Sequence, residues 1–226
     1  MATDREATTA DTRYSFTAQF LCASAIFARR CAAIERAAPD EETKTEHRGL
    51  VTAAIMQCTA AVEAESAELT IHGPGHHLGS NGIDKRGRDI LVPLAKLIDR
   101  QEVMERYTTI LHLLGKRPLS RGNKPSQHMA ILVRVRNELV HYKSQWGEDM
   151  KRKDLFKTLQ QLQLSKPPFV SPDTNFFPHQ FMGAACAAWS VRTAVTFLNT
   201  VYERLEIISP LDPHHPSVFC DNRLTG

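Results

Sequence analysis

The sequence predicts an all-α protein, and three observations support this expectation. Apolar residues recur at spacings of three and four along most of the chain, while the alternation typical of strands is almost absent. Proline and glycine separate the periodic segments. With 226 residues, 42% of them hydrophobic, the chain can bury one good core. We therefore expect one helical domain at 12–208, between a disordered tail at 1–11 and an irregular tail at 209–226.

Two long helices are expected in the first third of the chain. The first, residues 12–38, repeats aromatic and small residues on one face and is ended by Pro39. The second follows directly, because Asp40 is a suitable N-cap and Glu41 and Glu42 favour the positive end of the helix dipole. One apolar face of this second helix is formed by Val51, Ile55, Cys58, Val62 and Leu69.

A glycine-rich segment with three histidines, residues 72–89, interrupts the helical pattern and predicts a long loop. Its histidines, His72, His76 and His77, are potential metal ligands, but few acids lie nearby and their spacing matches no familiar metal site. No strand precedes the glycines and no GK[ST] follows them, so they do not resemble a phosphate-binding loop. We expect neither a metal nor another cofactor.

Three further helices complete the predicted bundle of about five long helices. A third helical region covers residues 90–114, with a possible kink near Pro93 and with Gly115 as its C-cap. A fourth starts near Pro125 or Ser126 and stops near Gly147. A short amphipathic piece at 149–164 and a proline-rich loop at 166–178 lead to a last long helix at about 178–208.

The fourth helix is apolar on two sides. Successive residues of a helix are turned by about 100°, and this geometry places one stripe of apolar residues toward the core and a second apolar strip further round the helix. Arg136 and His141 stand on the two edges of that strip, and Asn137 shares a face with His141 at a spacing of four. If the same helix of a second subunit covers the strip about a two-fold axis, the polar residues line a cleft between subunits. The core stripe contains Leu132, Val135, Leu139, Tyr142 and Trp146, and the predicted dimer strip contains Met129, Val133 and Val140.

A histidine beside an arginine suits phosphodiester chemistry. Imidazole can move protons near neutral pH, and a guanidinium offers a fixed set of donors that matches phosphate. The 2′-hydroxyl of RNA is an internal nucleophile, so a base, a cation and a placed acid can cleave the chain without metal.

The motif Arg136-Asn137-Glu138-Leu139-Val140-His141 resembles the R-x4-6-H signature of HEPN domains, with the polar residue that often follows the arginine. The resemblance covers the motif and the helix order, about residues 12–208. It implies an α-helical bundle that dimerises through facing motifs, and a metal-independent endoribonuclease of toxin–antitoxin, phage-defence or RNA-processing systems. It further implies that Arg136 and His141 are catalytic and that Asn137 supports them.

One variant of this family is silenced by a nucleotidyltransferase antitoxin at a tyrosine two residues after the histidine. Lys143 stands there in this chain, and Tyr142 is next to the histidine on the core stripe. We therefore do not expect this modification, although another antitoxin or regulatory protein remains a possible partner.

Charge is divided unevenly along the chain. Residues 116–157 contain eleven Lys and Arg against four Asp and Glu, whereas residues 40–68 contain seven acids against two bases. A basic stretch is commonly a solvated face, but beside the motif it could bind an RNA backbone. Glu63, Glu65 and Glu68 are expected on the solvated face of the second helix, with the alternative that one of them reaches the active cleft. The candidate RNA contacts are Arg134, Lys143, Lys151, Arg152 and Lys153.

Composition excludes several other classes of protein. The first residues lack the basic and apolar regions of a secretory signal, and Arg192 interrupts the most apolar long stretch. Five cysteines without metal-ligand pairing fit reduced thiols, so we expect a cytoplasmic protein without membrane insertion. The main hypothesis is a homodimeric HEPN-type endoribonuclease. The alternative is a non-catalytic α-helical dimer that binds RNA or a protein partner.

Overall fold

The computed structural model describes residues 16–71, 83, 85–120, 122–141, 153–207, 209 and 211. All regular elements among these residues are helical, which confirms the all-α prediction. The tails expected at 1–11 and 209–226, and the loop expected at 72–89, lie wholly or mostly outside the described residues. The helices are α1 (Phe16–Arg36), α2 (Glu41–Ile71), α3 (Lys85–Ile98), α4 (Val103–Leu113), α5 (Lys124–Val140), α6 (Lys153–Gln161) and α7 (Ala184–Leu205), with a short turn η2 (Phe176–Gln180) before α7.

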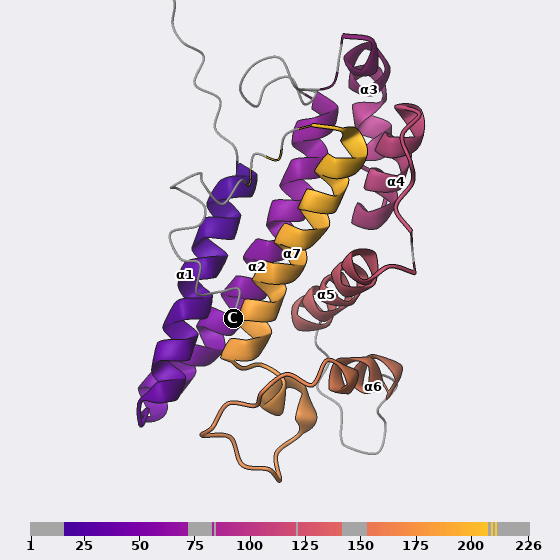
Figure 1. The fold of residues 1–226 in the computed structure, drawn as a ribbon. Helices are drawn as coiled ribbons and strands as arrows, with labels where there is room; N and C mark the ends of the chain where they lie inside the picture. The colour runs from indigo at the N-terminus through magenta and orange to yellow at the C-terminus, as the bar shows by residue number, and fades with distance from the viewer. Residues whose placement is uncertain are drawn as a thin grey trace, which may run out of the picture.

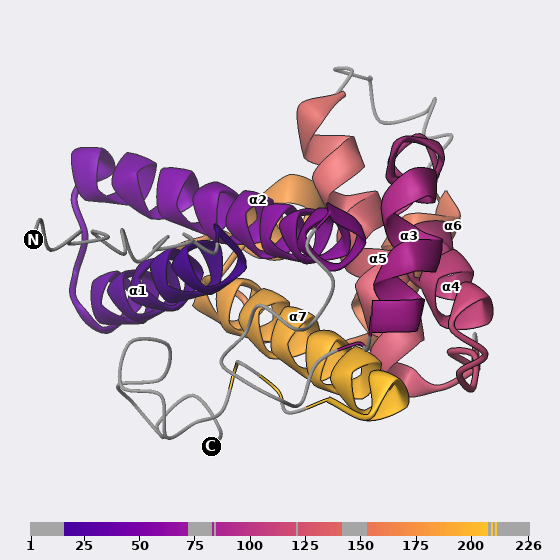
Figure 2. The same cartoon turned by 90° about the horizontal axis from the view of Figure 1, so that it is seen from above.

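Three long helices, α1, α2 and α7, lie side by side and form the main body of the fold (Figure 1). More than half of the 22 residues of α7 are buried, on several sides of the helix. Such a helix needs neighbours around it, because each apolar face must be removed from water. Figure 2 shows α1 on one side of the pair α2 and α7, and the shorter helices α3, α4, α5 and α6 on the other.

The helix ends largely follow the predicted signals. The Thr43 backbone N–H donates to Asp40 Oδ1 at 2.8 Å, as expected of an N-cap. Gly115, after α4, has a φ of 64°, the left-handed conformation that glycine adopts readily. Helix α5 begins one residue before Pro125, and its N-cap is Asn123, whose side chain accepts from the Ser126 N–H at 3.3 Å.

The prediction of one helix at 90–114, kinked near Pro93, is wrong. Helix α3 continues through Pro93, and the break comes after Ile98. The guanidinium of Arg106, in α4, donates to the backbone oxygens of Asp99 at 2.8 Å and Gln101 at 3.0 Å. These bonds satisfy carbonyl groups that the ended helix leaves free. Helix α3 also begins at Lys85, inside the expected loop, so the chain has more and shorter helices than the five predicted.

Glu65 corrects the prediction that three glutamates of the second helix face solvent. Its side chain is fully buried where α1, α2 and α7 meet, with the hydroxyl groups of Thr17 and Tyr202 beside it. Neither carboxyl oxygen forms a hydrogen bond of normal geometry among the described residues. Burial, together with the negative charge of Glu68, raises the pKa of the Glu65 carboxyl from 4.5 to about 7.

We predict that Glu65 makes the stability of the protein depend on pH. The folded state holds the Glu65 proton more tightly than the unfolded chain does, so the free energy of unfolding falls as the pH rises from 4.5 to about 7. The Glu65→Gln variant, which carries no charge, should lack this loss, on the order of 1–3 kcal/mol. Urea denaturation from about pH 5 to about pH 8 measures it. Glu203→Gln, at an exposed position of α7, is the matched control, and parallel curves for parent and Glu65→Gln would contradict the prediction.

Candidate functional site

The motif lies at the C-terminal end of helix α5, where Arg136 precedes the last turn and His141 is the C-cap. The core stripe is confirmed for Leu132 and Val135, which are fully buried, and for Leu139, which packs partly buried against the core. Tyr142 and Trp146, the other members of the stripe, lie outside the described residues. The helix ends at Val140, and Figure 2 shows this end of α5 reaching past α2 to the edge of the fold. The motif therefore lies where α5 leaves the cover of its neighbours.

Arg136 is held by an acidic residue of α2. Its Nη2 atom forms an ion pair with Glu63 Oε1, and the two side chains are 25% and 39% exposed. Helical periodicity does not identify Glu63 as the partner of Arg136, because the two residues are 73 positions apart. Their pairing comes from the packing of α5 on α2. Glu63 therefore belongs to the candidate site, which agrees with the alternative that one of the three glutamates reaches it and not with a purely solvated position.

The other two motif residues are accessible. Asn137 and His141 are both exposed. His141 is the C-cap of α5, and its backbone N–H donates to the Asn137 oxygen at 2.9 Å. Asn137 and His141 thus share one side of the helix, while Arg136 leans toward α2. The surface offers an imidazole, an amide and an arginine that a carboxylate orients, within one and a half turns of helix.

The predicted dimer strip is only partly at the surface. Val140 is 51% exposed, but Met129 is fully buried and Val133 packs partly buried against the core. The assignment of Met129 to a dimer interface is wrong, because Met129 lies on the face of α5 that is buried within the protomer, where α2 and α7 both pack on this helix. Of the three residues of the predicted dimer strip, Val140 is therefore the one most available to a partner.

The basic residues proposed to contact RNA can be placed only in part. Arg134 is exposed on α5, two residues before the motif arginine. Lys153 is the first residue of α6. Lys143, Lys151 and Arg152 lie outside the described residues, as do most residues that join α5 to α6.

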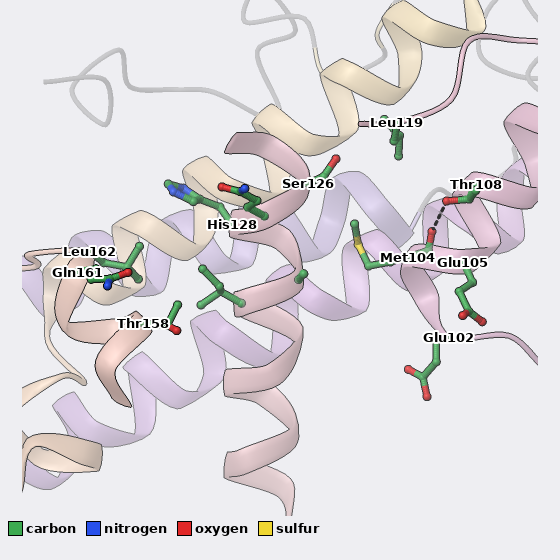
Figure 3. A pocket seen from close by; sticks show the side chains of 13 residues that line it. Glu102, Met104, Glu105, Thr108, Leu119, Ser126, His128, Thr158, Gln161 and Leu162 are labelled. Atoms are coloured by element: carbon green, nitrogen blue, oxygen red, sulfur yellow. Dashed lines mark hydrogen bonds between the residues drawn. The ribbon is translucent and has the colours of Figure 1, made fainter. Parts of the chain in front are cut away.

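A cavity of about 690 Å³ lies between α4, α5 and α6, beside the first half of α5 (Figure 3). Ser126 and His128 line it from α5, and Thr158 lines it from α6. Burial lowers the pKa of His128, and the positive charge of Lys124 lowers it further. None of the motif residues lines this cavity, so the two features are separate.

The described part of the chain gives little evidence for a metal site or for a reactive thiol. No group of three or more His, Cys, Asp or Glu side chains is arranged to hold a metal ion among the described residues. The three loop histidines, His72, His76 and His77, lie outside that part. Burial, with a smaller effect of the Glu35 charge at Cys31, raises the pKa of the Cys31 and Cys58 thiols to about 12, which disfavours the nucleophilic thiolate.

Comparison with known proteins finds no matching family model, no similar curated protein and no similar solved structure. Among the described helices, none is long and apolar enough to span a membrane.

We predict that the Arg136–Glu63 pair orients the arginine without adding much stability. Ion pairs at this exposure contribute little, because water and salt screen them. The coupling free energy between Arg136→Ala and Glu63→Ala, measured by a double-mutant cycle in urea, should be below about 1 kcal/mol. Arg134→Ala combined with Glu63→Ala is the matched control and should give no coupling. A coupling well above this value would mean that the pair is a structural element of the fold.

Proposed function

We propose that this protein is a metal-independent endoribonuclease of HEPN type that acts as a homodimer, as a toxin or as a phage-defence or stress effector. The observation that supports the proposal most is the position of the motif. Asn137 and His141 are exposed at the end of an otherwise core-packed helix, and Arg136, partly exposed about one turn before that end, is oriented by Glu63.

In the proposed reaction His141 acts as the acid–base group. Its imidazole takes the proton of an RNA 2′-hydroxyl, and the 2′-oxygen then forms a bond to the adjacent phosphorus. The bond from phosphorus to the 5′-oxygen of the next nucleotide breaks, and that oxygen receives a proton from the second motif of the dimer. The products are a 2′,3′-cyclic phosphate and a 5′-hydroxyl, so no oxidant, metal or cofactor is consumed.

Arg136 would hold the phosphate during this step. A guanidinium has five N–H donors, and the bond to Glu63 uses Nη2, so a second edge remains for phosphate oxygens. A fixed positive charge stabilises the negative charge that grows on the phosphate oxygens in the transition state. Asn137 shares a face of the helix with His141 and would orient the substrate or the imidazole.

The same ion pair supports a second candidate, a non-catalytic dimer that binds RNA or a protein partner. Glu63 neutralises much of the charge that Arg136 would otherwise present to a phosphate. If Arg136 stays paired with Glu63 when RNA is bound, it stabilises the structure of this surface and does not bind the scissile phosphate. The two candidate functions differ in whether the protein cleaves RNA.

We predict cleavage of end-labelled cellular RNA by the purified protein in EDTA, with 2′,3′-cyclic phosphate ends. His141→Ala should cleave at least roughly 100-fold more slowly, because it lacks the proton-transfer group. His112→Ala, at an exposed position of α4, is the matched control and should cleave at the parent rate. Circular dichroism checks that each variant is folded.

Two results would contradict this prediction. Equal cleavage by the parent and His141→Ala would exclude His141 from the chemistry. RNA binding without cleavage by either protein would favour the non-catalytic dimer.

The dimer can be tested separately. We predict that the parent sediments as a dimer at micromolar concentration and that Val140→Glu sediments as a monomer, because a buried unpaired carboxylate is costly at an interface. Leu97→Glu, on α3, is the matched control, since Leu97 is 61% exposed in the protomer. A monomeric parent would contradict both candidate functions.

A further inference from the structure

The cavity between α4, α5 and α6 has an apolar floor that a ligand can reach. Its volume is about 690 Å³, and its walls come from these three helices and from the loop before α5. Met104 of α4, Ala130 and Ile131 of α5, and Leu162 at the end of α6 all line it, and each of them is only partly buried. A concave apolar space of this size is typical of a small-molecule site when it also contains a few polar groups.

The α4 side of this cavity carries negative charge. Glu102 and Glu105 line the cavity there, and both are exposed (Figure 3). Neither carboxylate has an ion pair or a side-chain hydrogen bond among the described residues. Arg106, the next residue of α4, is engaged elsewhere, because its guanidinium donates to the backbone oxygens of Asp99 and Gln101. The two carboxylates are therefore available to a cation.

The remaining lining residues add no positive charge at neutral pH. No Lys or Arg of the described residues lines the cavity. His128 lines it from α5, and burial, with a smaller effect of the Lys124 charge, lowers the pKa of its imidazole, so the ring is largely neutral at pH 7. Gln161 and Leu162 lie on the opposite side of α5 from the two carboxylates (Figure 3). The cavity is thus negative at one end and uncharged at the other.

We propose that this cavity binds a small organic amine with an elongated apolar body. The ammonium group lies at Glu102 and Glu105, and the apolar body extends over Met104 and Ile131 toward the α6 side. Removal of the body from water supplies most of the affinity, and the two carboxylates supply the preference for a cation. The proposal is independent of ribonuclease activity, because none of the three polar motif residues lines this cavity.

Three compounds of similar size and different charge test the proposal by isothermal titration calorimetry. They are 4-phenylbutylamine, 4-phenylbutanol and 4-phenylbutyrate, which are cationic, neutral and anionic at pH 7. We expect saturable binding of one amine per protomer, about fivefold tighter than binding of the alcohol, because each exposed carboxylate adds a small, screened attraction. The carboxylate compound should bind most weakly. Addition of NaCl to about 0.5 M should remove most of the preference for the amine.

Two variants test where the amine binds. Glu102→Gln combined with Glu105→Gln should lower the affinity for the amine to that for the alcohol, and leave the alcohol unaffected. Ala130→Phe, a change in the cavity floor, should weaken both compounds at least roughly tenfold, because the added ring fills the space. Asp89→Asn combined with Glu203→Gln removes the same number of charges at exposed positions outside the cavity, so this matched control should bind like the parent.

The proposal is overturned if the parent shows no saturable binding of the amine, or binds the amine no more tightly than the alcohol. It is also overturned if the variant without the two glutamates keeps the parent's preference for the amine. Both glutamates are exposed, so this result is decisive even if circular dichroism shows that Ala130→Phe does not fold. A folded Ala130→Phe variant that binds the amine as tightly as the parent would likewise overturn the proposal. RNA cleavage by these variants has no bearing on any of these outcomes.

Discussion

The burial of α7 is the constraint on which the rest of the fold depends. Most of its residues are apolar or small, and the buried ones lie on several sides of the helix. Burial of that surface is the largest favourable contribution to folding, and it requires α1, α2 and α5 to pack around α7 together. The positions of α2 and α5, and with them both candidate sites, follow from this packing.

Packing on α7 and α2 also decides which parts of α5 remain available. One face of α5 is enclosed, so that Met129 is a core residue, whereas Asn137, Val140 and His141 at the C-terminal end of the helix are exposed. Arg136 lies at the boundary, where its long side chain can reach Glu63. A helix that passes from a buried to an exposed environment can combine a rigid support with reactive groups, as a functional site requires.

Two carboxyl groups in the interior, those of Glu35 and Glu65, differ in their hydrogen bonding. Glu35 is satisfied by His47 and by the first turn of α7, and this arrangement anchors the start of α7 to α1 and α2. Glu65 is fully buried beside the Thr17 and Tyr202 hydroxyl groups, without a hydrogen bond of normal geometry among the described residues, and burial raises its pKa. The first arrangement fixes the position of the first turn of α7, whereas the second leaves a carboxyl whose protonation couples to folding.

The sequence alone determined the helical class, several helix ends and the described part of the core stripe of α5, because these depend on local periodicity and on caps such as Asp40, Pro125 and Gly115. It also identified the motif residues as a set. Only the tertiary structure decided that Glu63 meets Arg136, that Glu65 and Met129 are buried, and that Glu35 and His47 form a pair at the start of α7. Periodicity marks which face of a helix is apolar, but not which distant residue covers it, since that depends on how the helices pack around α7.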